Sequence, residues 1–177
     1  HADNVAASIL GGFTIIQSYE PFHAIGLAPP PNLGVALAVP DVPIVERKTE
    51  MARAALPKSV PIEKMTHNIG QASGMIVGIL SGDLDLVGRS MIDAVVEPVR
   101  ARFVPSYHKV RENALAAGAA GVAISGAGPT MIAVVDERRT PSIRVAQAMK
   151  EAFETGRVNC RAFSSKAARG AVIIKQE

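Results

Sequence analysis

Hydrophobic residues in this chain recur with helical spacing in some segments and run almost continuously in others. The clearest helical pattern lies between residues 61 and 81, where apolar residues fall three or four positions apart and form one stripe. The stripe consists of Ile62, Met65, Ile69, Ala72, Ile76 and Ile79. Pro61 suits the first turn of a helix, and Gly82 ends the pattern. The segment is therefore predicted to be an amphipathic helix.

Shorter patterns predict the other elements and the fold class. The expected helices span residues 5–10, 49–56, 84–95, 107–117 and 141–153. The expected strands span residues 12–19, 33–39, 159–163 and 171–175, with two more on either side of a glycine turn at 125–130. The proline-rich segment 21–31 is predicted to be a stiff loop. Because helices and strands are interspersed without strict alternation, we expect an α+β fold with a small, largely antiparallel sheet and helices packed on one face.

Composition excludes several classes of protein. The chain has 177 residues, of which 48% are hydrophobic and 20% charged, as is typical of a globular protein. A net charge of +3 without basic runs beside aromatic residues gives no support for nucleic-acid binding. No apolar run reaches the length of a membrane-spanning helix, so no membrane association is expected. Cys160 is the only cysteine, which fits a reducing cytoplasm, and the spacing of the histidines predicts no metal site.

The turn from Ser125 to Thr130, with the sequence SGAGPT, could bind an anion. Gly126 and Gly128 permit positive φ and allow a ligand to approach the backbone. Successive amides in such a turn, including that of Ala127, can form a concave site for a phosphate oxygen, with the hydroxyls of Ser125 and Thr130 at its rim. Taken alone, however, a short glycine-rich turn favours a plain hairpin connection.

Five segments together resemble a known family. The turn is similar to the third signature motif of the GHMP kinases, the superfamily of galactokinase, homoserine kinase and mevalonate kinase. The other four segments resemble homoserine kinase motifs, and they occur in that family's order over nearly the whole chain. They are HADNVAASILGGF at 1–13, TEMARAALP at 49–57, HNIGQASGMIVGIL at 67–80 and EPVRARFVPSY at 97–107. The chain is thereby identified as resembling the C-terminal part of a homoserine kinase.

This resemblance implies a fold and an activity. The fold would be the GHMP kinase C-terminal domain, a ferredoxin-like antiparallel sheet with helices. The activity would be ATP-dependent phosphorylation of the L-homoserine hydroxyl, which gives O-phosphohomoserine for threonine biosynthesis in the cytoplasm. ATP and Mg²⁺ would be the cofactors of the intact enzyme. The glycine turn would lie near the phosphates of the nucleotide.

The resemblance also assigns candidate substrate-binding residues. An amino-acid substrate carries a carboxylate, which the guanidinium fork of arginine binds in a bidentate manner. Arg53 and Arg100 lie on the two arginine-bearing motifs and are expected to do this, and the family pattern favours Arg100 over Arg102. Thr49 would orient the substrate or cap its helix. His1 would contact homoserine, although a frayed terminal residue is the alternative reading.

Asp3 and Asn4 are the candidate catalytic residues. They stand within about one residue of the position where mevalonate kinases carry a catalytic aspartate, so Asp3 could act as a general base. A role as the helix N-cap explains either residue equally well. Homoserine kinases are thought to work without a dedicated base, since positioning and phosphate electrostatics supply much of phosphoryl-transfer catalysis.

Two motifs of the family are absent from this sequence. One is the N-terminal P-x-x-x-N-L-G segment, and the other is the P-x-x-x-G-L-G-S-S-A loop, whose helix N-terminus grips ATP phosphates. We therefore expect residues 1–32 to be the remnant of an ATP-binding domain with its connector, and residues 33–177 to be the C-terminal domain. The chain alone is expected to be inactive. Homoserine kinases are often dimers, but nothing in the sequence locates an interface.

Two alternative functions remain open at this stage. The chain could belong to another GHMP kinase that acts on mevalonate, phosphomevalonate or galactose. It could also be an α+β binding or oligomerisation module without catalysis, in which the glycine turn is purely structural.

Overall fold

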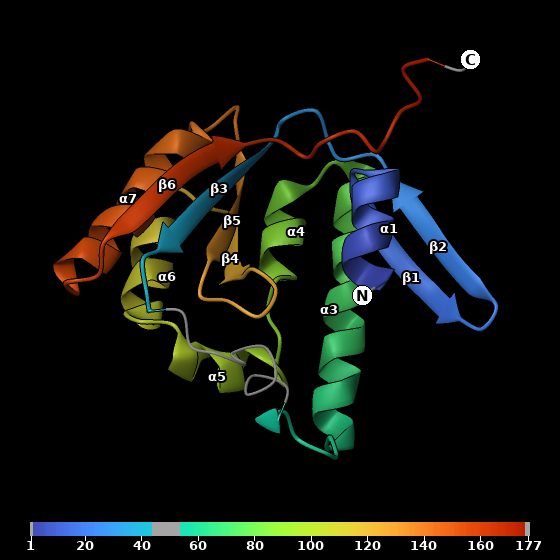
Figure 1. Cartoon of the computed structure of the whole chain (residues 1–177), viewed down its shortest axis with the longest axis horizontal. Helices are drawn as coiled ribbons and strands as arrows, with labels where there is room; N and C mark the ends of the chain where they lie inside the picture. The colour runs from blue at the N-terminus through green and yellow to red at the C-terminus, as the bar shows by residue number, and fades with distance from the viewer. Residues whose placement is uncertain (1, 44–53, 176–177) are drawn as a thin grey trace.

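The structure, a computed structural model, describes residues 2–43 and 54–175. Within them, a four-stranded antiparallel sheet with the strand order β4-β5-β3-β6 forms the centre, and a separate hairpin of β1 and β2 stands beside it. Figure 1 shows α6 and α7 on the left of the sheet, α3 and α4 on the right, and α1 with the hairpin farther right. The predicted α+β class with an antiparallel sheet is confirmed.

The hairpin occupies a segment that the sequence predicts in part as loop. After α1 (Ala2–Leu10), β1 (Phe13–Tyr19) pairs with β2 (Phe22–Leu27) in an antiparallel register. The prediction of a loop over residues 21–31 is therefore wrong for residues 22–27, which form β2. Pro21 lies in the tight connection between the strands, where its missing N–H removes no ladder hydrogen bond, so the proline marks the turn and does not prevent pairing.

The central sheet is built around β3 (Leu33–Pro40), which pairs with both β5 (Met131–Asp136) and β6 (Cys160–Ser165). The short strand β4 (Gly121–Ile124) completes the sheet on the far side of β5. Because successive side chains of a strand point to opposite faces, β3 and β5 contribute to two separate hydrophobic clusters.

The larger cluster lies between the sheet and the helices α6 (Tyr107–Ala116) and α7 (Ser142–Thr155). Met131 from β5 and Met149 and Phe153 from α7 are completely buried there. This face agrees with the predicted layer of helices on a sheet, whereas the expectation that helices pack on one face alone is wrong, because the opposite face is covered as well. On the opposite face, Val134 of β5 packs in a smaller cluster with Ile79 of α3 (Ile62–Ser81) and Val87 of α4 (Leu84–Arg89).

The helix predicted over residues 61–81 is confirmed as α3, but only one end of its apolar stripe is buried. Ile79 is 6% exposed, whereas Ile62 and Ile69 near the other end are 60% and 58% exposed. Gly82, with a φ of 74°, ends the helix in the left-handed conformation that glycine adopts readily. A regular apolar stripe thus predicts the helix correctly, while the extent of its burial depends on neighbours that lie elsewhere in the chain.

Two further predicted elements are wrong in the structure. The helix expected over 84–95 ends at Arg89, because the Asp93 carboxylate binds the amides of the next residues and starts a new helix instead. The strand expected over 171–175 does not form. The chain there runs along the end of α1, where the Ala171 amide donates to the Ile9 carbonyl oxygen. The helix expected over 49–56 lies largely outside the described residues.

Helix α4 and strand β4 approach each other closely where both carry glycine. A Cβ atom at Gly88 would overlap the Ala120 carbonyl, and one at Gly121 would overlap the backbone of Gly88. The two backbones therefore touch, and this contact fixes α4 against the sheet.

Substitution of Gly88 by alanine should therefore destabilise the protein by about 2–3 kcal/mol, since the added methyl must displace backbone. Gly70→Ala is the matched control, because a Cβ there meets nothing within 4 Å on the exposed surface of α3. That control should be stabilised by about 0.5–1 kcal/mol through helix propensity. Urea unfolding followed by circular dichroism measures both, and equal stability of the two variants would contradict the contact.

Candidate substrate and phosphate site

A cavity of about 350 Å³ lies where α3, the segment after α4 and the glycine turn come together. Helix α3 contributes Asn68 and Gln71 to its lining, α5 (Glu97–Arg100) contributes Arg100, and the turn contributes Gly126. Three segments that the sequence predicts to be functional, 67–80, 97–107 and 125–130, therefore meet in one pocket. A 3-10 helix, η1 (Ala101–Phe103), follows α5 directly.

The glycine turn has the positive φ values that its sequence permits. Gly126 and Gly128 have φ values of 56° and 74°. The turn is closed by the Ser125 amide, which donates to Thr130 O at 2.8 Å, and by the Gly128 amide, which donates to Ser125 O at 3.0 Å. Within the described chain, the amides of Gly126 and Ala127 have no hydrogen-bond partner. Two successive amides are thus free to bind a phosphate oxygen.

Arg100 connects the pocket to the turn. Its Nη1 donates to the carbonyl oxygen of Gly126 at 2.8 Å. Its Nε atom is buried and has no hydrogen-bond partner among the described residues. Buried donors are normally satisfied, so this one indicates an acceptor that the described part of the chain does not supply. A carboxylate in the pocket would be such an acceptor.

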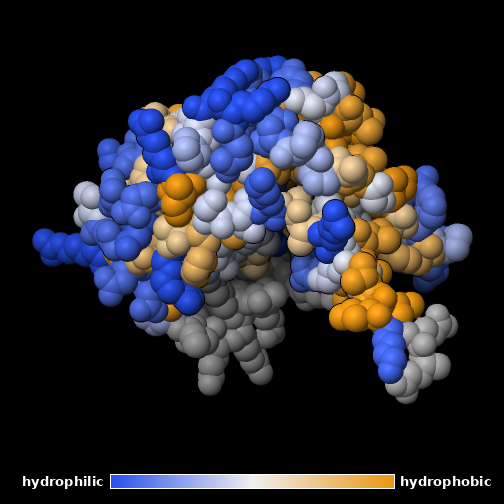
Figure 2. Space-filling view, turned by 90° about the horizontal axis from the view of Figure 1, so that it is seen from above, coloured by the Kyte–Doolittle hydropathy of each residue, from blue (hydrophilic) through white to orange (hydrophobic). Residues whose placement is uncertain are grey.

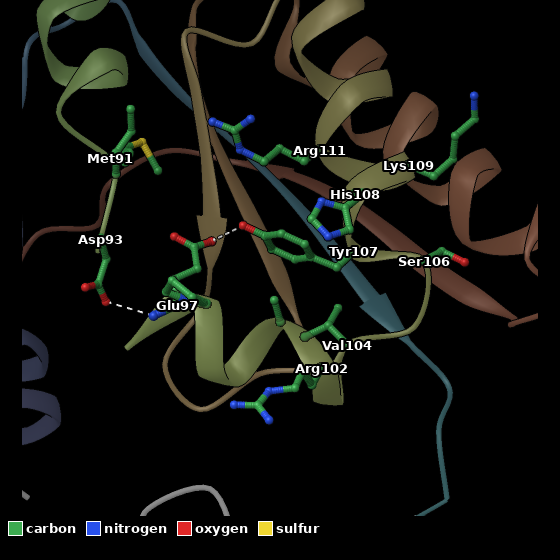
Figure 3. Close-up of a pocket in the computed structure, with 13 residues that line it drawn as sticks. Met91, Asp93, Glu97, Arg102, Val104, Ser106, Tyr107, His108, Lys109 and Arg111 are labelled. Carbon is green, nitrogen blue, oxygen red and sulfur yellow. Dashed lines mark hydrogen bonds between the residues drawn. The ribbon is translucent and has the colours of Figure 1, made fainter. Parts of the chain in front are cut away.

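Glu97 lies on the same short helix and is half-buried. Its Oε1 accepts hydrogen bonds from the Tyr107 hydroxyl at 2.9 Å and from the Ile124 amide at 3.1 Å. Burial raises the pKa of the Glu97 carboxyl above its usual range, against the effect of these hydrogen bonds. Burial and the Glu97 carboxylate together raise the pKa of Tyr107 to about 12. Tyr107 therefore stays protonated near neutral pH, and its hydroxyl donates a hydrogen bond to Glu97, which Figure 3 marks with a dashed line.

Asp93 caps the start of α5. Its carboxylate accepts hydrogen bonds from the amides of Val95, Val96 and Glu97. It also accepts one from Asn68 Nδ2 at 2.8 Å, while Asn68 Oδ1 accepts from the Ala94 amide at 2.9 Å. Burial alone would raise the pKa of the Asp93 carboxyl, but these hydrogen bonds outweigh it and hold the pKa below its ordinary value.

A second cavity of about 800 Å³ lies on the other side of α5. Glu97 and Asp93 line both cavities. Figure 3 shows residues that line this cavity, among which the Tyr107 hydroxyl points directly at the Glu97 carboxylate. The remaining polar lining consists of three basic side chains, Arg102, Lys109 and Arg111, together with Ser106 and His108.

The predicted site residues divide into three groups. Arg100 and Gly126 lie at the pocket, and Ser125, Ala127, Gly128 and Thr130 form the rest of its turn. Asp3 and Asn4 are exposed in the first turn of α1, inside the helix and not before it, and they do not line the pocket. His1, Thr49 and Arg53 lie outside the described residues.

Sequence reasoning missed three residues that hold the site together: Asn68, Asp93 and Glu97. Asn68 and Glu97 lie within the quoted motif segments, so their polar character was a usable signal. Asp93 lies outside those segments, and its role as a cap follows only from the end of α4. Among the described residues, no group of three or more His, Cys, Asp or Glu side chains could hold a metal ion, and no helix is long and apolar enough to cross a membrane.

Comparison with known proteins supports this reading of the fold. Residues 75–155 match the family described as GHMP kinases C terminal. Homoserine kinase from Chlorobaculum tepidum is 42% identical over 153 residues, which is 86% of this chain and 46% of the relative. Homoserine kinase from Pyrobaculum neutrophilum is 44% identical over 146 residues, 82% of this chain and 48% of the relative.

Solved structures give the same result. The crystal structure of homoserine kinase from Cytophaga hutchinsonii superimposes with a TM-score of 0.89 at 35% identity, covering 96% of this chain and 53% of that one. Mevalonate kinase from L. major has a TM-score of 0.52 at 12% identity, which indicates a shared fold alone. The chain spans about half the length of the relatives that it matches.

The class that these findings indicate is the GHMP kinases: residues 75–155 match the C-terminal family model, and the fold is similar to that of a homoserine kinase. Within that class, the chain is related to the homoserine kinases over most of its length.

Proposed function

We propose that this chain is the C-terminal part of a homoserine kinase, which transfers the γ-phosphate of ATP to the hydroxyl of L-homoserine and releases O-phosphohomoserine. The observation that carries the proposal is the convergence of Arg100 and the glycine turn on one pocket. The relatives named homoserine kinase support the choice of substrate within the superfamily.

Arg100 binds the substrate carboxylate in this proposal, with its buried Nε as one donor. Arg53, Thr49 and His1 complete the substrate contacts that the family resemblance implies. Asp3 and Asn4, in the first turn of α1, remain the candidates for a catalytic role.

The free amides of Gly126 and Ala127 are suited to phosphate oxygens of the nucleotide, with the hydroxyls of Ser125 and Thr130 beside them. ATP supplies the phosphoryl group, and Mg²⁺ enters with it as a charge-neutralising ion. The chain's own contribution is to place the hydroxyl of homoserine near that group and to stabilise charge with fixed donors.

We further propose that residues 1–32 belong with an ATP-binding domain and residues 33–177 form the C-terminal domain. The hairpin of β1 and β2 forms a sheet of its own. Large apolar side chains on α1 and this hairpin are exposed, including Val5, Ile9 and Phe22. Figure 2 shows hydrophobic residues gathered toward the side of the molecule where these elements lie, as expected for a face that packs on further protein.

Binding of small alcohols by a full-length protein that carries this chain tests the substrate. L-Homoserine should raise the melting temperature in a thermal-shift titration, whereas mevalonate and galactose at the same concentrations should leave it unchanged, because only homoserine combines a carboxylate with an α-ammonium group. D-Homoserine is the matched control for stereochemistry. A shift with mevalonate or galactose and none with L-homoserine would assign the chain to another GHMP kinase.

A further inference from the structure

We propose that Glu97 is a positioning residue which, with Asn68 and Asp93, locks helix α5 in place and thereby sets the conformation of the glycine turn from Ser125 to Thr130. Only the ligand of that turn depends on the proposed function. The hydrogen bonds that carry the inference are properties of the chain itself.

Helix α5 needs an external support. It has four residues, from Glu97 to Arg100, whereas isolated helices shorter than about 12 residues are marginal in water. The Asp93 carboxylate provides the support by binding three amides at its start. Asn68 then ties this cap to α3 through Asp93 and the Ala94 amide. The long helix α3 thus determines where the short helix lies.

Helix α5 in turn holds the glycine turn at two points. Glu97 accepts the hydrogen bond of the Ile124 amide, immediately before the turn. Arg100 donates to the Gly126 carbonyl, two residues farther along. Ser125 lies between these two contacts, and the free amides of Gly126 and Ala127 follow directly. The direction in which those amides point is therefore fixed from α5.

Tyr107 completes the arrangement by orienting Glu97. Its hydroxyl donates to the same Oε1 atom that accepts from Ile124, and its ring packs edge-on against His108 at a centroid distance of 5.1 Å. A carboxylate held between a phenol and a backbone amide has little rotational freedom. Glu97 therefore acts on the turn through hydrogen bonds, without requiring contact with the substrate.

Hydrogen exchange of the 177-residue chain, followed by NMR, tests this role directly. The amides of Ile124, Ser125 and Gly128 are hydrogen-bonded and report the state of the turn. Glu97→Ala should increase their exchange rates about tenfold, while amides of the central strand β3 keep theirs. Glu97→Gln retains a carbonyl oxygen for the Ile124 amide and should restore the wild-type rates within about twofold.

Three further variants separate positioning from general stability. Asn68→Ala should increase the hydrogen-exchange rates of the same turn amides, although Asn68 lies on another helix. Tyr107→Phe should increase these rates by a smaller factor. Glu112→Gln on the exposed side of α6 is the charge-matched control and should change none of them. Unchanged exchange rates of the turn amides in both Asn68→Ala and Tyr107→Phe would overturn the proposal. An equal increase in the exchange rates of the turn and of β3 would also overturn it, because it would indicate a purely global loss of stability.

Titration of the same samples with pyrophosphate tests the ligand of the turn separately. The proposal expects shifts at the Gly126 and Ala127 amides that weaken in Glu97→Ala and return in Glu97→Gln. If the wild-type chain gives no such shifts but its turn amides still depend on Glu97, the positioning role stands and the phosphate assignment fails.

Discussion

Replacement of Arg100 by alanine is expected to lower kcat/KM for L-homoserine by about 100-fold to 1000-fold in a full-length protein that carries this chain. The guanidinium has two roles in the structure. It holds the Gly126 carbonyl through Nη1, and its buried Nε lacks a partner among the described residues. Truncation removes the proposed donor for the substrate carboxylate and one of the two contacts that hold the turn, so KM should rise and kcat should fall.

Steady-state kinetics with two control variants check this expectation. Arg102→Ala removes an equal charge from the exposed neighbour two residues away and should stay within about threefold of the wild type. Arg100→Lys keeps the charge but loses the planar fork, so it should fall between wild type and alanine. Normal kinetics in Arg100→Ala together with a loss in Arg102→Ala would show that the pocket has been assigned to the wrong arginine.

The 177-residue chain alone is expected to transfer no phosphate from ATP to L-homoserine. The described pocket offers two free amides and the hydroxyls of a single turn to the nucleotide. The sequence contains no P-x-x-x-G-L-G-S-S-A loop, whose helix N-terminus would bind the remaining phosphate charge. Without that loop, the triphosphate lacks most of its electrostatic stabilisation.

Transfer of radioactive phosphate measures this requirement. The chain should give no product above background, and a protein that joins it to the N-terminal half of a homoserine kinase relative should regain activity. The same fusion with Arg100→Ala is the matched control for activity that arises outside this pocket. Robust turnover by the chain alone would contradict the requirement.

Elements with a regular local pattern could be predicted from the sequence. Helix α3 and strand β3 lie almost where their apolar patterns indicate. The helix has a regular helical spacing, the strand is a short, nearly continuous apolar run, and each has a clear breaker at its end. The glycine turn was also recognisable, since positive φ at Gly126 and Gly128 is what such a sequence permits.

Elements that depend on distant partners could not be predicted. Strand β2 exists because β1 pairs with all of its residues, with one register shift between Ile16 and Ser18, and this pairing outweighs the prolines near it. The residues from 171 to 175 have strand-forming side chains, but Ala171 bonds to the end of α1 and residues 172–174 are largely exposed, so they pair with no strand. Helix α4 stops at Arg89 because of a carboxylate four residues farther along the chain.

The candidate site divides in the same way. Arg100 and the turn were accessible from motif resemblance, whereas the connection between Asn68, Asp93 and Glu97 was not. Asn68 and Asp93 are 25 residues apart, and Glu97 and Ile124 are 27 residues apart. Contacts at such separations follow from the packing of α3 and α5 against the sheet, and single-sequence spacing does not encode them.

Phosphoryl transfer by the joined protein is the most direct test of the central claim, that this chain supplies the substrate pocket of a homoserine kinase. With radioactive ATP and Mg²⁺, L-homoserine should be converted to O-phosphohomoserine, and Arg100→Ala in the same protein should remove that activity. Phosphorylation of mevalonate or galactose without any labelled homoserine, or homoserine phosphorylation that is unaffected by loss of Arg100, would contradict the account.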